Sequence, residues 1–460
     1  MSNFWDYSVW GAILLFGVLL GSLLVGNILK RRIPFLKESL IPTSVIGGIV
    51  LIIVAAIYKA VTGEVMFDSA VFGGKGTDTL EMITYHALAL GFVASALTTS
   101  DAKMTKKRAS EVFNTGVTTV STYLLQGIVG MIITMVAALI IKGFFPAAGL
   151  ILPFGFGQGT GQALNYGNIY ETQFGFSGGK SFGLTIAALG FLSAAIGGVI
   201  HLNIMKRRGT LKISGNKYKH NTDKIESAIE IPMQESIDKM TIQLALIFIS
   251  YLMAYLLMYL LGKLLPGMKA TIFGFNFLLG VISAMLVKAV LQFLRKHRIV
   301  RRKYTNNFLL TRTENFFFDV MIVAGVAAIR LDVLEQYWGI ALILGVVGLV
   351  ITFIYNRIVA KTLFKEYQEE QFLAMYGMLT GTASTGIILL REIDGDFETP
   401  AADNLVYQNF PAIVFGFPLM FLALLAPVKP VLTTIILAAF FLVLNIILFR
   451  SKIFKRKNKK

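Results

Sequence analysis

Long apolar runs, each about 20 residues, alternate along this chain with short polar segments. A helix of that length crosses the roughly 30 Å hydrocarbon layer of a bilayer, because it rises about 1.5 Å per residue. The pattern therefore predicts an all-α polytopic membrane protein. We expect about eleven transmembrane helices, near residues 9–29, 45–61, 82–97, 112–141, 182–205, 242–261, 273–293, 316–331, 340–355, 407–425 and 431–449.

Two segments rich in glycine and in hydroxyl or amide side chains interrupt this pattern. They are Gly155–Gln162 (Gly-Phe-Gly-Gln-Gly-Thr-Gly-Gln) and Leu379–Gly386 (Leu-Thr-Gly-Thr-Ala-Ser-Thr-Gly). Lipid offers no hydrogen-bond partner, so non-helical backbone at membrane depth must be buried in protein or face a water-filled cavity. A matched pair of such segments, one in each half of a chain, is typical of the binding site of a secondary transporter.

Basic residues follow many of the apolar spans, which is the pattern of cytoplasmic loops. The net charge of +17 therefore indicates membrane topology and contact with anionic lipids, not nucleic-acid binding. All the basic clusters lie in the cytoplasm if the N-terminus is outside and each glycine-rich segment enters and leaves on one side. We therefore expect two re-entrant hairpins, at about 150–180 and 371–403, and a cytoplasmic C-terminus.

The two halves of the chain match weakly in the order of their elements. Gly159-Thr-Gly161 corresponds to Gly381-Thr-Ala383, and the first helix of each half runs in the opposite direction across the membrane. This predicts two inverted repeats of five helices and one hairpin, with a binding site near the bilayer midplane. The expected divisions are residues 1–205, a cytoplasmic linker at 206–238, a second repeat at 239–426, and an extra helix with a basic tail at 427–460.

The glycine-rich segments carry groups that suit both an ion and an anion. Glycine permits positive φ and close approach of backbone to a ligand, freed carbonyls can coordinate Na⁺, and N–H groups at a half-helix start can hold a carboxylate. Small-residue helix packing is the alternative interpretation of either segment taken alone. The predicted binding residues are Gly157, Gln158, Gly159, Thr160, Gly161, Gln162, Thr380, Gly381, Thr382, Ser384 and Thr385, with Thr160 and Thr382 expected to contribute to Na⁺ binding.

Two arginines are candidate partners for a substrate carboxylate. Arg330 closes the predicted 316–331 helix, and Arg391 directly follows the second glycine-rich segment. Each also has a structural interpretation: Arg330 as a terminal arginine paired with Asp332, and Arg391 as an anchor at the cytoplasmic side.

Three other polar residues lie within the predicted spans. Asp319 is either a functional carboxylate or the cap of a helix that begins near the interface. Gln126 and Asn276 are interpreted as hydrogen-bonding residues between helices.

The sequence lacks the residue patterns that are typical of an enzyme active site. The chain has no cysteine, its four histidines are not spaced as metal ligands, and it has no nucleotide-binding loop or Ser/His constellation. We therefore expect no enzymatic activity and no cofactor. A passive channel is the remaining alternative of another class.

Several segments resemble bacterial sodium/glutamate symporters. The segment Phe35–Gly48 looks like the family's connection between the first two helices. Gly157–Gly161 resembles its first glycine-rich motif, with Gln158 where a histidine is usual, and Gly325–Glu335 is similar to its "GLKLWEL" region, with Arg330 where a lysine is usual. The second segment, Gly377–Gly386, departs more from the family's "GHCGFGLGATP".

The resemblance implies Na⁺-coupled import of glutamate or a similar anionic amino acid. It also implies a homodimer in the bacterial cytoplasmic membrane that works by an elevator-type mechanism. The related 2-hydroxycarboxylate carriers share the paired hairpins, so citrate or malate is the alternative substrate.

Overall fold

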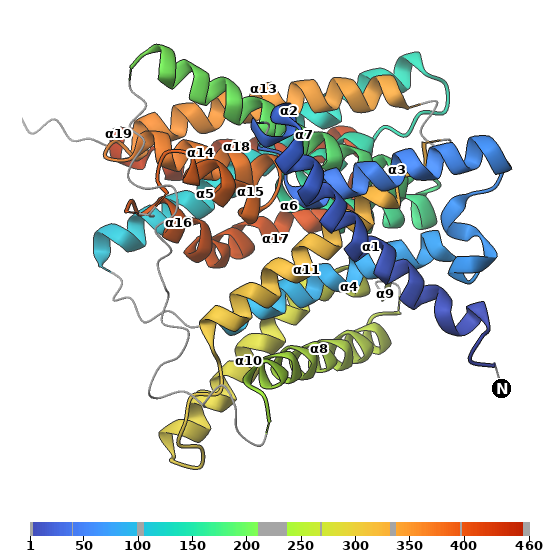
Figure 1. Ribbon diagram of the computed structural model, residues 1–460. Helices are drawn as coiled ribbons and strands as arrows, with labels where there is room; N and C mark the ends of the chain where they lie inside the picture. The colour runs from blue at the N-terminus through green and yellow to red at the C-terminus, as the bar shows by residue number, and fades with distance from the viewer. Residues whose placement is uncertain are drawn as a thin grey trace, which may run out of the picture. The chain divides into compact units, whose positions relative to one another are not determined.

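The computed structural model describes residues 3–38, 40–98, 105–209, 237–266, 269–331, 337–395 and 398–453, and the elements in these ranges are helices (Figure 1). Nine of the described helices are long and apolar enough to cross a membrane. A bent pair, Ala401–Tyr407 with Pro411–Leu425, makes up to ten. The predicted all-α polytopic class is confirmed at this level. Most of the predicted linker at 206–238 lies outside the described residues.

The chain divides into two compact units. Unit 1 contains residues 1–21, 53–103 and 220–327, and unit 2 contains residues 22–52, 104–219 and 328–460. Each unit therefore takes segments from both halves of the sequence.

Unit 1 is built on α4, which packs against α10 and α11, while α10 also packs against α8. Its apolar core joins Leu90 and Val93 of α4 with Ile247 of α8 and Ala284 of α10. The Lys288 ammonium donates to the Thr98 carbonyl at 2.5 Å, next to the C-terminal end of α4. The elements are α1 (Tyr7–Arg32, as far as Gly21), α3 (Thr43–Thr62, from Ile53), η1 (Met66–Asp68), η2 (Ala70–Phe72), α4 (Gly76–Leu97), α8 (Lys239–Leu264), α9 (Lys269–Gly274), α10 (Asn276–Lys296) and α11 (Asn307–Ala327).

The predicted helix at 316–331 is wrong at both ends. Helix α11 begins at Asn307, where the Asn306 side chain accepts from Leu309 N at 2.8 Å, and it ends at Ala327. Arg330 therefore follows the helix instead of closing it, and Asp319 is mid-helix and cannot be its cap. The apolar residues after Ala327 concealed the end of the helix.

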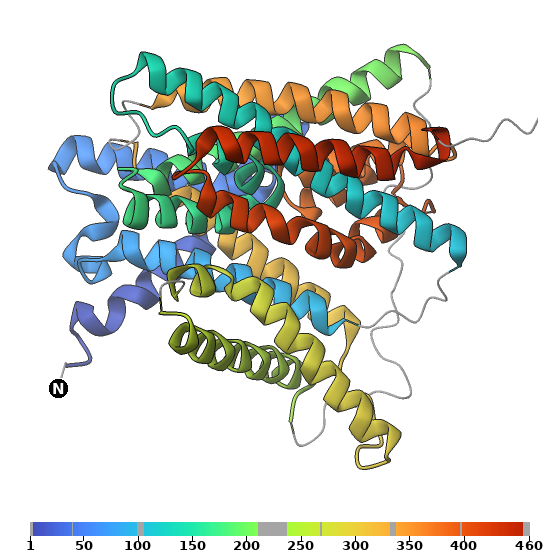
Figure 2. The ribbon, with the colours of Figure 1, turned by 180° about the vertical axis from the view of Figure 1, so that it is seen from behind.

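Unit 2 contains both glycine-rich segments. Helix α6 packs along α7, α14 packs against α15, and α18 runs beside α5, as Figure 2 shows in red and cyan. The elements are the remainder of α1 (from Ser22), α2 (Pro34–Glu38), the first part of α3 (as far as Ile52), α5 (Lys106–Ile140), η3 (Ala148–Leu150), α6 (Ile151–Phe174), α7 (Gly179–Arg207), α13 (Trp338–Leu363), α14 (Gln368–Thr380), α15 (Ala383–Arg391), α16 (Ala401–Tyr407), α17 (Asn409–Leu425), α18 (Pro430–Leu448) and α19 (Arg450–Ile453).

Helices α6 and α7 meet backbone to backbone. A Cβ added at Gly167 would collide with the Gly179 carbonyl, and one added at Gly183 would collide with the Ala163 carbonyl. Only glycine permits this approach, which is the packing mode of small residues between membrane helices. The second half of α6 is therefore held against the start of α7.

The start of α14 is fixed by three charged or titratable side chains. Arg357 donates to both oxygens of Glu369, at 2.7 and 2.6 Å, and His201 Nε2 lies 2.7 Å from Glu369 Oε2. Burial alone would raise the pKa of Glu369, but hydrogen bonds from His201 and Arg357 lower the pKa to about 2. The Glu369 carboxylate therefore stays ionised and ties α14 to α7 and α13.

Replacing Gly167 by alanine is expected to destabilise the protein. The new methyl group must push α6 away from α7, and such overpacking costs about 1–3 kcal/mol. Gly339→Ala in α13 is the matched control, because no atom lies within 4 Å of its added Cβ. Thermal unfolding in detergent should show a lower midpoint for Gly167→Ala only. Equal midpoints for the two variants would contradict the close packing.

The Glu369 contacts also predict a pH dependence of stability. Because the folded-state pKa lies below the ordinary value of 4.5, the stabilisation is complete above that value and is lost as the pH falls toward 2. Between about pH 5 and pH 3, the unfolding midpoint of the native protein should fall more steeply than that of Glu369→Gln. Glu370→Gln is the control, since burial raises the pKa of that neighbouring carboxyl. Parallel pH profiles for the native protein and Glu369→Gln would refute this account.

Candidate functional site

Helical backbone in unit 2 is interrupted at both glycine-rich segments. Helix α6 breaks at Gly159, whose φ of 77° and ψ of −169° are reached readily only by glycine. Helices α14 and α15 are separated by Gly381 and Thr382, and the Thr382 hydroxyl caps α15 by accepting from Thr385 N at 3.4 Å. We refer to these as the first break and the second break.

Helix α5 contacts both breaks through two side chains on one face. The Tyr123 hydroxyl donates to the Gly157 carbonyl at 3.0 Å, and Gln126 Nε2 donates to the Leu379 carbonyl at 3.0 Å. Residues three apart on a helix are neighbours on its surface. The carbonyl-bearing ends of the two interrupted helices therefore lie side by side along one helical turn of α5.

Helix α7 supplies a second shared support. A Cβ on Gly190 would lie 2.7 Å from the Thr380 carbonyl and 3.2 Å from Phe156 Cα. Thr380 directly precedes the second break, and Phe156 lies three residues before the first. The flanks of both breaks therefore approach the same glycine of α7.

The residues predicted around the first break are mostly buried. Thr160 is fully buried, Gln162 is 1% exposed, and Gln158 is half-buried. Gln162 Oε1 accepts from Asn165 Nδ2 at 3.3 Å, while Gln162 Nε2 is buried with no hydrogen-bond partner in the described part of the chain. The first break thus presents an amide donor in addition to the backbone N–H groups that follow Gly159.

Among the predicted residues around the second break whose side chains the structure describes, Thr382 is partly accessible and the others are buried. The Thr380 hydroxyl is buried and donates to the Tyr376 carbonyl at 2.7 Å. The hydroxyl oxygens of Thr382 and Thr385 are 3.3 Å apart, with Thr385 buried and Thr382 half-buried. The Ser384 side chain is outside what the structure describes.

The two predicted arginines are not brought to the breaks. Arg391 is exposed at the C-terminal end of α15, about 14 Å along the helix from Thr382. Arg330 is also exposed, and its backbone N–H donates to Ser181 Oγ at 3.3 Å, about 14 Å along α7 from Gly190.

Each break joins a negative and a positive helix end. The carbonyls at the end of the first helical half carry partial negative charge, and the N–H groups that open the next half carry partial positive charge. A cation can therefore bind at one side of a break and an anion at the other. The predicted binding residues between Gly157 and Gln162, and between Thr380 and Thr385, carry no formal charge of their own.

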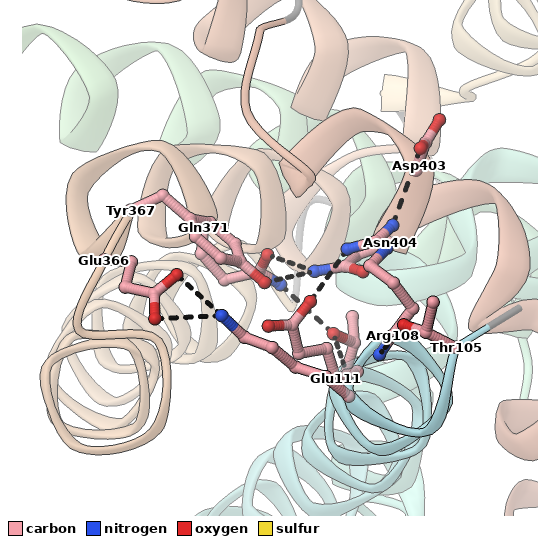
Figure 3. A network of polar contacts seen from close by, with 10 residues as sticks. Thr105, Arg108, Glu111, Glu366, Tyr367, Gln371, Asp403 and Asn404 are labelled. Atoms are coloured by element: carbon pink, nitrogen blue, oxygen red, sulfur yellow. Dashed lines mark hydrogen bonds and ion pairs between the residues drawn. The ribbon is translucent and has the colours of Figure 1, made fainter.

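A polar network fixes the opposite end of α14, as Figure 3 shows. At the start of α5, Lys107 pairs with Glu366 at 2.8 Å, and Arg108 contacts Glu111 at 2.8 Å and Asp403 at 3.5 Å. Deeper in unit 2, Asn404 donates to Gln371 Oε1 at 2.9 Å, and Gln371 in turn donates to Thr115 Oγ1 at 3.2 Å.

Helix α14 is thus bonded to α5 at both ends. Gln371 contacts α5 near the start of α14, and Leu379 contacts it near the second break. The position of the second break is set by this pair of contacts.

The sequence analysis missed Tyr123 and Gly190. Its interpretation of Gln126 and Asn276 as hydrogen-bonding residues between helices is confirmed, because Gln126 Nε2 donates to Thr352 Oγ1 at 2.8 Å and Asn276 Nδ2 donates to the Tyr85 carbonyl at 3.0 Å. A signal for Tyr123 was present in the sequence, because Tyr123 and Gln126 are spaced three residues apart within an apolar run. Nothing in the sequence indicates which carbonyls they reach.

Comparison with known proteins provides the last evidence. The family model described as Sodium/glutamate symporter matches residues 11–397, which include both breaks and most of the two units. No individual curated protein matches the chain significantly. The match covers well over half of the sequence, and it identifies a transporter, not an enzyme. The chain belongs to the sodium/glutamate symporter family.

Proposed function

We propose that this protein imports glutamate or a similar anionic amino acid together with Na⁺, through a site at the two breaks. The observation that carries the proposal is that both interrupted helices meet on α5 and on Gly190 of α7. Paired broken helices in corresponding halves are typical of secondary transporters whose substrate and ions bind to exposed backbone.

In this proposal, the substrate carboxylates bind to N–H groups at the two helix starts. These are the N–H groups that follow Gly159 and Thr382, supplemented by Gln162 Nε2 and the hydroxyls of Thr160 and Thr382. Na⁺ binds to carbonyl and hydroxyl oxygens of the breaks. Arg391, and the contact of Arg330 with Ser181, lie about 14 Å along a helix from the breaks. We therefore propose that these arginines attract the anion toward unit 2 and do not contact it directly.

We further propose that the two halves are inverted repeats, each with one re-entrant hairpin. The composition of the units supports this. Unit 1 takes α4 from the first half and the pair α10 and α11 from the second, while unit 2 takes α5, α6 and α7 from the first half and α13 to α17 from the second. Each half therefore contributes one interrupted element to unit 2.

Alternating access by an elevator movement is part of the same proposal. Both breaks and the helices that contact them belong to unit 2. This unit can therefore move as one body while its ligands remain bound. The basic clusters support an N-terminus outside and a C-terminus in the cytoplasm. The proposal also includes a homodimer in the bacterial cytoplasmic membrane, as the resemblance to the symporters implies.

Purified protein in liposomes should accumulate glutamate when an inward Na⁺ gradient is imposed, because the ion and the amino acid bind together. Uptake of radiolabelled glutamate is the measurement, with choline replacing Na⁺ as the control. Accumulation that is unaffected by the Na⁺ gradient would reject the coupling. Uptake of citrate or malate in place of glutamate would favour a hydroxycarboxylate carrier, and non-saturating ionic conductance would favour a channel.

Thr382→Val should weaken transport, because it removes both the cap of α15 and a proposed ligand oxygen. Loss of such a cap costs about 0.5–2 kcal/mol, so the apparent affinity for glutamate should fall by about twofold to thirtyfold. Thr382→Ser keeps the hydroxyl and should transport like the native protein. Concentration curves for glutamate and for Na⁺ distinguish the variants, and native affinities in Thr382→Val would remove this residue from the site.

A further inference from the structure

Four buried polar side chains form a cluster between α5 and α13, beside the end of α14. Thr122 and Gln126 lie one turn apart on α5, and Thr352 and Asn356 lie one turn apart on α13. None of the four is more than 1% exposed. Gln126 Nε2 donates to Thr352 Oγ1 at 2.8 Å, and Asn356 Nδ2 donates to Thr122 Oγ1 at 3.4 Å. We call these four residues the amide cluster.

The hydrogen bonds of the amide cluster fix which way each amide faces. Gln126 Nε2 makes its second bond to the Leu379 carbonyl at 3.0 Å, and Asn356 Nδ2 makes its second bond to the Thr352 carbonyl at 2.9 Å. A backbone carbonyl can only accept. Turning either amide over would place oxygen against oxygen, so the observed orientations are required by the network.

The two amide oxygens are therefore left without donors. Gln126 Oε1 and Asn356 Oδ1 are both buried, and neither has a hydrogen-bond partner in the described ranges. An unpaired buried acceptor costs about 1–3 kcal/mol, and most such groups in folded proteins find a partner. Thr122 adds another oxygen with one lone pair remaining, because its proton is donated to the Thr118 carbonyl at 2.8 Å and its other lone pair accepts from Asn356 Nδ2.

We propose that the amide cluster is a sodium site, with Gln126 Oε1 and Asn356 Oδ1 as ligands and hydroxyl oxygens of the threonines as further ligands. Each unpaired amide oxygen carries partial negative charge and can bind a cation. The four side chains are neutral, whereas protein sites for divalent cations commonly use carboxylates. Neutral oxygens suit a monovalent ion that must also leave. This inference rests on the proposed Na⁺-coupled function and places a Na⁺ ion at residues outside the two glycine-rich segments, in addition to the oxygens proposed at the breaks.

The position of the site connects the ion to the second break. Gln126 coordinates through its oxygen while its NH₂ group holds the Leu379 carbonyl, two residues before Gly381. A cation on the amide oxygen polarises the amide and strengthens the hydrogen bonds that the NH₂ group donates. Binding of Na⁺ therefore tightens the end of α14, and by linkage an anion that needs the same ordered break binds more strongly.

Two variants of similar volume remove one proposed ligand each, namely Gln126→Met and Asn356→Leu. The matched control is Asn445→Leu in α18, because Asn445 is an amide that faces α13 but already has its oxygen paired. Its Oδ1 accepts from the Tyr355 hydroxyl at 2.8 Å, and its Nδ2 donates to the Phe441 carbonyl at 2.8 Å. Binding of radiolabelled Na⁺ to purified protein, with choline keeping the ionic strength constant, measures the ion directly without a substrate.

We expect Gln126→Met and Asn356→Leu each to weaken Na⁺ binding by about tenfold or more, and Asn445→Leu to stay within about twofold of the native protein. Native-like Na⁺ affinity in both cluster variants would overturn the site and leave a buried water as the partner of the two oxygens. An equal loss in Asn445→Leu would overturn it too. If either cluster variant fails to fold, Thr122→Val removes one hydroxyl oxygen at constant shape and must also weaken Na⁺ binding.

The outcome for the native protein separates this inference from the proposed function. Saturable Na⁺ binding and Na⁺-driven uptake by the native protein, combined with unchanged binding in the cluster variants, would reject only the site. Absence of Na⁺ binding and of Na⁺-driven uptake in the native protein would reject the proposed function itself.

Discussion

Interrupted helical backbone must find hydrogen-bond partners inside the protein, because lipid provides none. Unit 2 meets this requirement largely through α5. Its Tyr123 and Gln126 donate to one carbonyl next to each break, and its Thr115 accepts from Gln371 near the start of α14. The 35-residue length of α5 allows one helix to contact α14 both near its start and near the second break. Specific hydrogen bonds from α5 therefore fix the carbonyls next to each break.

Close backbone contact is the second requirement, and glycine provides it. Gly167, Gly179 and Gly183 bring α6 onto α7, and Gly190 lets α7 approach the flanks of both breaks. A larger side chain at Gly190 would separate the Thr380 carbonyl from Phe156. Hydrogen bonds from α5 and close contacts with α7 therefore act from two directions on the same pair of breaks.

The sequence predicted the parts of this architecture that depend on local composition. Apolar length located the spans, with the exception of α11, whose Arg312, Glu314 and Asp319 lower its hydropathy and whose end is masked by apolar residues beyond Ala327. Glycine and hydroxyl content located both breaks to within a few residues. The supporting contacts could not be predicted, since Gln126 and Leu379 are 253 residues apart and either could have faced another helix.

The same limit applies to the chemistry of the site. Arg330 and Arg391 were predicted to pair with a substrate carboxylate because they are charged. In the structure, Arg391 and the contact of Arg330 with Ser181 lie about 14 Å along a helix from the breaks. Gln126 was interpreted as a hydrogen-bonding residue between helices, and its bond to Thr352 of α13 confirms this, but the sequence could not indicate which of its amide atoms is paired. Only the three-dimensional network shows that its NH₂ group is fully used while its oxygen is not.

The absence of formal charge at the breaks has a consequence for coupling. Transferring a single ion from water into a low-dielectric interior costs on the order of 20 kcal/mol by an idealised estimate, and protein dipoles recover only part of that cost. A neutral site that accepts a cation and an anion together keeps the loaded unit close to electrically neutral. Under the proposed function, the helix ends orient the two ligands, and each ligand compensates the charge of the other. Fixed arginines inside the breaks would remove this mutual dependence, because they would stabilise the anion without the ion.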